Sequence, residues 1–275
     1  MFPITYITRA DLKRAAETLN TPVAVVQAVT AVEARKSGFI KGTDLPCILF
    51  EGHKFSAFTQ GVYDRRHPTI SYPKWTKEHY VGGRGEYDRL IEAIRINDDD
   101  PEPALKSASW GMFQIMGFNY ADAGYGSVRA FVNAMSLGEN RHLDAFVSFI
   151  QANDLDDELR SEEWARFAEA YNGPGYKANA YDVKLANAFI EAVMRTREET
   201  SGATLDLERG DAVKLQTALN VAINAGLVPD GWVGRKTREA IRKLQAREGW
   251  DETGKVDERL CAYLGLDVAA YLQEA

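Results

Sequence analysis

The 275-residue sequence has little that would support metal, nucleotide or disulfide chemistry. Its two cysteines, Cys47 and Cys261, lie far apart, so no structural disulfide is expected. No Gly-rich loop of the Walker or Rossmann type and no nucleophile elbow occurs, which disfavours nucleotide chemistry. The four histidines have no metal-ligand spacing. We therefore predict no metal site and no cofactor.

The sequence also lacks a basic excess and a long apolar run. Its formal net charge of -7 predicts no nucleic-acid partner. No segment approaches the roughly 18 uninterrupted apolar residues of a membrane span, and the N-terminal residues lack the pattern of a signal peptide. We expect a chain made as a soluble cytoplasmic protein, without direct membrane insertion.

Length and composition indicate a modular globular protein. A chain of 275 residues exceeds the usual size of one compact domain, and its hydrophobic content of 45% is ordinary for a soluble fold. Residues 196–207 lose helical periodicity in favour of Arg, Glu, Thr, Ser and Gly. We therefore expect a domain over residues 1–195, a linker over 196–207 and a small domain over 208–275.

The segment from Thr21 to Gly38 predicts a buried helix that carries an unexpected carboxylate. Thr21 is a candidate N-cap, Pro22 suits the first helical position, and Gly38 is a candidate left-handed stop. At helical spacing, Glu33 lies on the same arc as several apolar side chains. These are Pro22, Val25, Val26, Val29 and Val32.

The position of Glu33 on an apolar arc has two interpretations. Loss of hydration raises the pKa of a carboxyl group, and a raised pKa suits a general acid near neutral pH. Alternatively, Glu33 marks the helix end reaching the surface, or it forms a structural pair with Arg35, Lys36 or His53.

The rest of the sequence predicts a mainly α-helical protein with one small strand region. Thr8 and Asp11 form a capping box for a first helix, which packs on the helix of Glu33. Residues 47–50 predict a strand or hairpin, followed by an irregular loop to residue 80, and residues 107–117 a second buried element. Further helices are expected at 87–96, from Ser127 to Met135, at 143–150, from Ser161 to Tyr171 with Gly173 beyond its end, and at 181–194.

The C-terminal part predicts three short helices. Two of them cover residues 213–222 and 237–247, with a turn-rich segment at 229–234 between them, and the third begins after residue 256. The pair Leu-Gln recurs at 215–216 and 244–245, which indicates two related half-units.

Three carboxylates follow one another near the predicted strand: Glu33, Asp44 and Glu51. Two carboxylates across a cleft are the usual arrangement for cleaving a glycosidic bond. One protonates the leaving oxygen and the other holds a water, a nucleophile or a developing positive charge.

Four motifs in order resemble the N-acetylmuramidase domain of phage endolysins, over roughly residues 1–195. They are Val-Glu-Ala at 32–34, Ile-Leu-Phe-Glu-Gly-His at 48–53, Ser-Trp-Gly-Met-Phe-Gln-Ile-Met-Gly at 109–117 and Tyr-Asn-Gly-Pro-Gly-Tyr at 171–176. Their order is also similar to goose-type lysozymes and soluble lytic transglycosylases. The resemblance implies a lysozyme-like α-helical catalytic domain with a small hairpin.

A second resemblance covers about residues 208–266. Residues 213–220, 230–237 and 240–245 are similar to a peptidoglycan-binding module of three short helices. Two unrelated stretches thus point to one polymer, peptidoglycan.

The resemblance places Glu33 at the family's general-acid position. For the second carboxylate, Glu51 is preferred to Asp44, because Glu51 closes an apolar strand and His53 projects from the same side. Asp44 follows Gly42 and is as well explained as a turn residue. Goose-type enzymes often show Glu-Ser-Gly, whereas residues 33–38 here read Glu-Ala-Arg-Lys-Ser-Gly.

Candidate ligand contacts follow from the same motifs. Candidate sugar contacts are His53, Ser109, Gln114, Tyr171 and Asn172, although Gln114 is equally well explained by internal hydrogen bonding. Candidate wall contacts in the small module are Asp230, Trp232, Arg235 and Arg242. A solvated basic helix face explains the arginines equally well.

The resemblance predicts a modular endolysin that hydrolyses the β-1,4 bond between N-acetylmuramic acid and N-acetylglucosamine and lyses the host cell. The alternatives are a lytic transglycosylase that forms 1,6-anhydro ends, and a non-catalytic wall-binding virion protein. We expect a monomer that depends on a holin-type pore, because a chain without a signal segment reaches the wall only after the membrane is breached.

Overall fold

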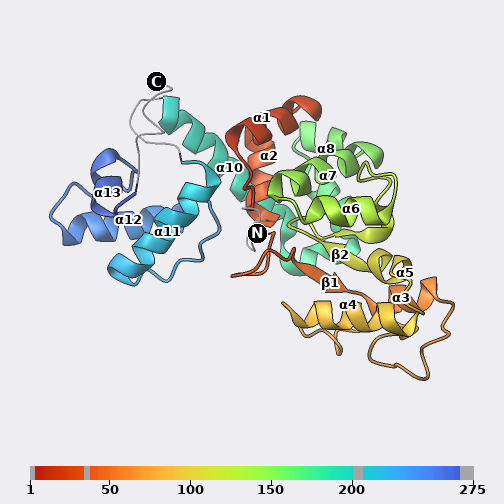
Figure 1. Cartoon of the computed structure of the whole chain (residues 1–275). Helices are drawn as coiled ribbons and strands as arrows, with labels where there is room; N and C mark the ends of the chain where they lie inside the picture. Colours follow the sequence, from red (N-terminus) through yellow and green to blue (C-terminus); the bar gives the residue numbers. More distant parts are fainter. Residues whose placement is uncertain (1–3, 34–37, 201–206, 267–275) are drawn as a thin grey trace. The chain divides into compact units, whose positions relative to one another are not determined.

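The structure is a computed structural model that describes residues 4–33, 38–200 and 207–266, and it is mainly α-helical (Figure 1). The described residues divide into two compact units. One lies within Met1–Thr5 and Lys36–Asp157, and the other within Tyr6–Arg35 and Glu158–Ala275. No helix in the described part of the chain is long and apolar enough to cross a membrane.

The first unit contains a small antiparallel sheet of β1 (Ile48–Phe50), β2 (Ala108–Trp110) and β3 (Ile115–Met116), in the order β1-β2-β3. In the register, Leu49 is opposite Ser109 and Ser109 is opposite Met116. The predicted strand is therefore confirmed. The second buried element is a hairpin of β2 and β3.

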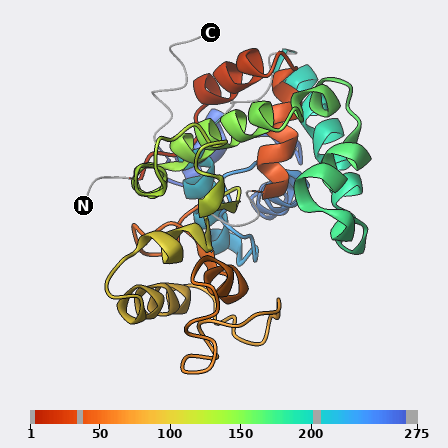
Figure 2. The ribbon, with the colours of Figure 1, turned by 90° about the vertical axis from the view of Figure 1, so that its right-hand side faces the viewer.

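Helices pack around this sheet. They are α3 (Gly52–Phe58), α4 (Gly85–Ile96), α5 (Glu102–Lys106), the 3-10 helix η1 (Gly117–Asn119), α6 (Val128–Met135) and α7 (Glu139–Ala152). As predicted, Ser127 caps α6, with its side chain accepting from the Ala130 N–H. The prediction of an irregular loop directly after β1 was wrong, because α3 begins at Gly52. The irregular segment is shorter and runs between α3 and α4 (Figure 2).

In the second unit, α1 (Arg9–Thr18), α2 (Val23–Glu33), α8 (Asp156–Arg160, which starts in the first unit), α9 (Trp164–Asn172), the 3-10 helix η2 (Pro174–Asn179) and α10 (Tyr181–Thr200) follow one another. The capping box of Thr8 and Asp11 is formed, and α1 packs on α2 as predicted. The main packing partner of α2 is α10 (Figure 1). The buried side chains of α2 are Ala24, Val25, Val26, Ala28, Val29, Thr30 and Val32.

Four predicted helix boundaries were wrong. The Thr21 hydroxyl is buried without a hydrogen-bond partner among the described residues and so does not cap α2, and Pro22 is exposed. Gly38 is not left-handed; a Cβ there would lie 2.5 Å from Nδ1 of His142, so close packing requires the glycine. Helix α9 begins at Trp164 rather than near Ser161, because Glu162 adopts a positive φ of 55°. The helix α10 also continues to Thr200, into the segment expected to be linker.

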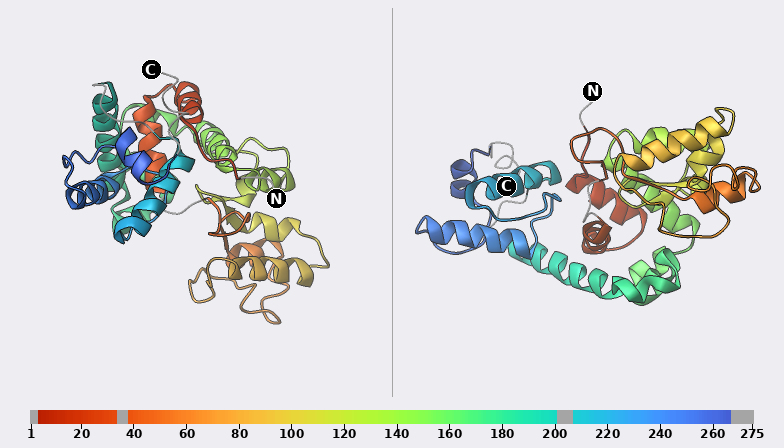
Figure 3. Two further views of the ribbon diagram at one scale, coloured as in Figure 1. Left: turned by 60° about the vertical axis from the view of Figure 1, so that its left-hand side comes forward. Right: turned by 90° about the horizontal axis from the view of Figure 1, so that it is seen from below.

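The C-terminal module is built from α11 (Arg209–Ile223), α12 (Arg235–Arg247) and α13 (Glu258–Tyr263) (Figure 3). As predicted, its half-units are related: each buried glutamine accepts a hydrogen bond from the N–H of a left-handed glycine. Gln216 Oε1 accepts from Gly231, and Gln245 Oε1 accepts from Gly254, each at 2.8 Å. These two hydrogen bonds close the turns that lie beside the hydrophobic core of the module. The core consists of Leu215, Leu219, Ala240, Ile241, Leu244, Val256, Leu260 and Cys261.

Candidate functional site

Glu33 is the last residue of α2, and its carboxylate accepts a hydrogen bond from the Tyr181 hydroxyl at the start of α10. Protein atoms crowd around the carboxyl group, and this loss of hydration raises the pKa of Glu33 from its ordinary 4.5 to about 7. The hydrogen bond from Tyr181 acts in the opposite direction, because it stabilises the ionised form. Glu33 is therefore held near the point where it exchanges a proton at neutral pH.

Two further side chains belong to this cluster, and both come from the end of α9. Asn172 lies beside Tyr181: burial and the charge of Glu33 raise the pKa of the Tyr181 phenol, and the Asn172 side chain partly offsets that rise. Tyr171 lies near the same carboxylate, and burial followed by the charge of Glu33 raises the pKa of its phenol. The structure thus brings the predicted residues Glu33, Tyr171 and Asn172 together.

Tyr181 is a residue that the sequence patterns missed. Its neighbour Ala180 has a left-handed φ of 47°, and Gly173 at the end of α9 has a φ of 76°. These two positions reverse the chain between α9 and α10, so that Tyr181 returns to Asn172. In the sequence, Tyr181 shows only as the first residue of a predicted helix.

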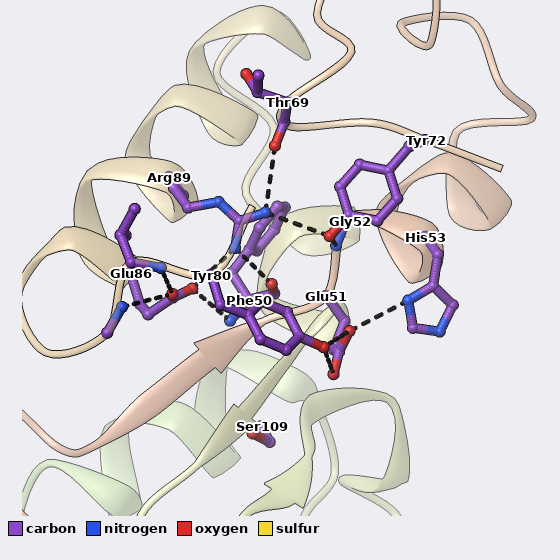
Figure 4. A network of polar contacts seen from close by, with 12 residues as sticks. Phe50, Glu51, Gly52, His53, Thr69, Tyr72, Tyr80, Glu86, Arg89 and Ser109 are labelled. Carbon is purple, nitrogen blue, oxygen red and sulfur yellow. Dashed lines mark hydrogen bonds and ion pairs between the residues drawn. The ribbon is translucent and has the colours of Figure 1, made fainter. Parts of the chain in front are cut away.

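The second carboxylate cluster lies in the first unit, at the end of β1. The Glu51 N–H donates to the Ser107 carbonyl at 2.9 Å, which extends the strand pairing to Glu51. The Tyr80 hydroxyl lies 2.8 Å from both carboxylate oxygens of Glu51, and His53 Nδ1 lies 3.2 Å from Oε2 (Figure 4). Burial lowers the pKa of His53, although the charge of Glu51 acts the other way. His53 does lie beside Glu51 as expected, but α3 rather than strand alternation places it there.

Tyr80 is held in place by a buried ion pair on α4. The Glu86 carboxylate accepts from the N–H groups of Val81 and Gly82 at 2.8 and 3.0 Å, and from Phe50 at 3.1 Å. Arg89 Nη1 donates to Glu86 at 2.9 Å, and its other contacts reach back to residues 50, 69 and 72 (Figure 4). Glu86 is fully buried. The ion pair therefore fastens the segment after residue 69 to the end of β1.

The remaining predicted residues of this unit have local roles. Asp44 lies in an exposed turn after Gly42, which has a φ of 76°, and this favours its interpretation as a turn residue. Gln114 has a φ of 50°; it accepts from Ser109 Oγ at 2.8 Å and donates to the carbonyls of Gly111 and Cys47. The Gln114 amide therefore makes internal hydrogen bonds, within the β2–β3 hairpin and to the residue before β1, as its alternative interpretation predicted, and the Ser109 hydroxyl is one of its partners.

In the module, Asp230 accepts from Gln216 at 2.7 Å and from the Trp232 N–H at 2.9 Å, so it closes the turn. The guanidinium of Arg209 lies 5.3 Å from the Trp232 ring centroid. Arg235 and Arg242 are exposed on α12.

Comparisons with known proteins identify the families of the two parts of the chain. Residues 22–192 match the N-acetylmuramidase family. The chain belongs to that family. Residues 208–264 match the peptidoglycan binding domain family. Among solved structures, the crystal structure of the Burkholderia AP3 phage endolysin is 39% identical, covers 70% of this chain and 74% of its own, and has a TM-score of 0.64. No curated protein matches.

This N-acetylmuramidase is a peptidoglycan hydrolase with a separate peptidoglycan-binding module, and it acts on the cell wall. The predicted family, the mainly α-helical fold and the glycoside hydrolase class are confirmed. Membership of an enzyme family also argues against the non-catalytic virion protein.

Proposed function

We propose that this N-acetylmuramidase hydrolyses the β-1,4 bond between N-acetylmuramic acid and N-acetylglucosamine, with Glu33 as the general acid. The observation that carries the proposal is the desolvated Glu33 carboxyl group, whose pKa is about 7. A carboxyl group with this pKa is still partly protonated at neutral pH and can protonate a leaving oxygen. The bond from Tyr181 fixes its orientation.

Glu51 is the second carboxylate in this proposal, in preference to Asp44. The side chain of Glu51 is only 14% exposed and is held by Tyr80 and His53, whereas Asp44 lies in an open turn. In hydrolysis, the oxygen of a water bonds to the anomeric carbon while the glycosidic oxygen leaves with the proton of Glu33. Glu51 either takes the proton of that water or first stabilises the positive charge at the anomeric carbon.

Tyr171, Asn172 and His53 are proposed sugar contacts, because an exposed or half-buried amide, phenol or imidazole beside the acids can bind glycan hydroxyls. In the module, the exposed Arg235 and Arg242 are proposed to bind carboxylates of the stem peptides. Asp230 and Trp232 would act there by shaping the turn that precedes α12.

The test of the general acid compares Glu33→Gln with Glu17→Gln, an exposed carboxylate on α1 in the same unit. We expect Glu33→Gln to lose at least about a thousandfold in lysis of purified peptidoglycan, since it removes the proton donor. Glu17→Gln should retain full activity. A folded Glu33→Gln protein that keeps most of its activity would refute the assignment.

Mass spectrometry of the digested wall separates hydrolysis from the alternative, a lytic transglycosylase. In that reaction the same acid protonates the leaving oxygen, but the 6-hydroxyl of the muramic acid attacks. Reducing ends indicate hydrolysis and 1,6-anhydro ends indicate transglycosylation.

The second carboxylate is tested by Glu51→Gln against Asp44→Asn. We expect a loss of at least about a hundredfold in kcat for Glu51→Gln and of less than twofold for Asp44→Asn. Of these two carboxylates, only Glu51 is positioned by neighbouring side chains, those of Tyr80 and His53. The reverse order would assign the role to Asp44.

Similarity to a phage endolysin supports a role in host cell lysis. We propose that the protein is made in the host cytoplasm as a monomer and reaches the wall through a holin-type pore. Bacteria that express it should lyse only after the membrane is permeabilised, and light scattering should give the mass of one chain. Lysis without permeabilisation would contradict the dependence on a pore.

A further inference from the structure

Trp75 is an exposed tryptophan in the segment that the Glu86–Arg89 ion pair fastens. It keeps 58% of its surface exposed, although tryptophan is among the largest apolar side chains. An isolated exposed apolar residue needs no explanation, but this one lies beside a tyrosine that belongs to the candidate site.

Trp75 lies beside Tyr80. Burial raises the pKa of the Tyr80 phenol, the side chain of Trp75 acts in the opposite direction, and the Tyr80 hydroxyl donates a hydrogen bond to Glu51. The polar edge of the indole therefore lies next to a group of the candidate site. Lys77 lies with its Nζ 5.6 Å from the ring centroid, and a cation on one face of the indole leaves the other face as the apolar surface.

The segment that carries Trp75 is anchored at both ends. At residues 69 and 72 the Thr69 carbonyl and the Tyr72 hydroxyl accept from Arg89, and at residues 81 and 82 the backbone donates to Glu86. In addition, the rings of Tyr72 and His79 pack with their centroids 4.9 Å apart. An aromatic ring held in this way loses little freedom when a ligand covers it, so it is preorganised for binding.

We propose that Trp75 is a saccharide-binding platform, on which one N-acetylated hexosamine ring of the glycan strand stacks with its apolar C–H face. Tyr80 is then a positioning residue that joins this platform to the Glu51 carboxylate. A pyranose fits this site better than a fully apolar ligand, because the indole face is bordered by hydrogen-bonding groups and an ammonium group. The proposal rests on the proposed role of Glu51 in glycan cleavage.

The experiment measures kcat and KM on glycan strands stripped of stem peptides, with Trp75→Ala, Trp75→Leu, Tyr80→Phe and Val62→Ala. Val62 is 67% exposed in the same unit and serves as the matched control. We expect about a tenfold rise in KM for both Trp75 variants with kcat within about twofold of wild type. Tyr80→Phe should lower kcat while KM changes little, and Val62→Ala should match wild type.

A binding measurement separates this proposal from the assignment of the catalytic carboxylates. Calorimetry with the same glycan strands, in a Glu33→Gln background, should show about tenfold weaker binding for Trp75→Ala and none of this effect for Val62→Ala. Unchanged binding and unchanged KM for a folded Trp75→Ala or Trp75→Leu protein would overturn the platform, whatever Glu33→Gln does. Weakened binding together with an active Glu51→Gln enzyme would keep the platform and overturn the role of Glu51.

Discussion

The hydrogen bond from Tyr181 to Glu33 allows a quantitative prediction of the pH at which catalysis is lost. Tyr181→Phe removes one donor and leaves the ring. Burial raises the pKa of Glu33 to about 7, and the Tyr181 hydroxyl restrains that rise because it stabilises the carboxylate. Without the hydroxyl the carboxylate is less stable, so the acid holds its proton to higher pH.

The size of the effect follows from the strength of such bonds. A hydrogen bond to a charged group contributes about 1.5–3 kcal/mol, and 1.36 kcal/mol corresponds to a tenfold change in proton affinity. A general acid works only while protonated, so activity falls as the pH rises through its pKa. We therefore expect the midpoint of the alkaline limb of kcat/KM to lie near pH 7 in wild type and about one pH unit higher in Tyr181→Phe.

The assay is lysis of purified peptidoglycan between about pH 5 and 9 at constant ionic strength. Tyr125→Phe is the control, since Tyr125 is a half-buried tyrosine on the other unit, packed on Phe131. An alkaline limb that stays at the wild-type position in Tyr181→Phe would refute the reasoning, and a shift toward lower pH would reverse its sign.

Three further predictions concern stability. The pKa of Glu33 is raised from 4.5 in the unfolded chain to about 7 in the folded protein, so its ionisation increasingly destabilises the folded state as the pH rises between these values. Glu33→Gln should therefore raise the free energy of unfolding, measured by urea denaturation, by up to about 3 kcal/mol at pH 8 and by much less at pH 4. Gly38→Ala should cost about 1–3 kcal/mol because its Cβ meets His142, and an unchanged Tm would contradict this close contact. Glu86→Ala leaves Arg89 buried without its partner and should cost about 3–5 kcal/mol in the same assay, whereas a loss below about 1 kcal/mol would show that the pair is not needed.

Local sequence patterns predicted the parts of the fold that depend on local physics. The capping box at Thr8, the cap at Ser127 and the spacing of apolar residues located α1, α6 and several other helices. The same reasoning failed at α3, because a seven-residue helix that starts at Gly52 has too short a pattern to distinguish from a loop. It also misjudged Gly38. A glycine is needed there because a side chain would collide with His142 on α7, not because the backbone angle is left-handed.

The residues of the candidate site also fall into those that sequence patterns reveal and those that they do not. Glu33 stood out because a carboxylate on an apolar arc is visible in the sequence, and Tyr171 and Asn172 followed from a motif. Neither signal could reveal the two tyrosines that bind the carboxylates. Tyr181 is 148 residues from Glu33 in the sequence, and Tyr80 is 29 residues from Glu51, in a segment without periodicity. A hydroxyl donor has no positional signature, since its effect on a carboxylate depends on distance in space alone. A candidate acid can therefore be predicted from sequence, whereas the residues that set its proton affinity depend on how α9 and α10, or β1 and α4, are folded against it.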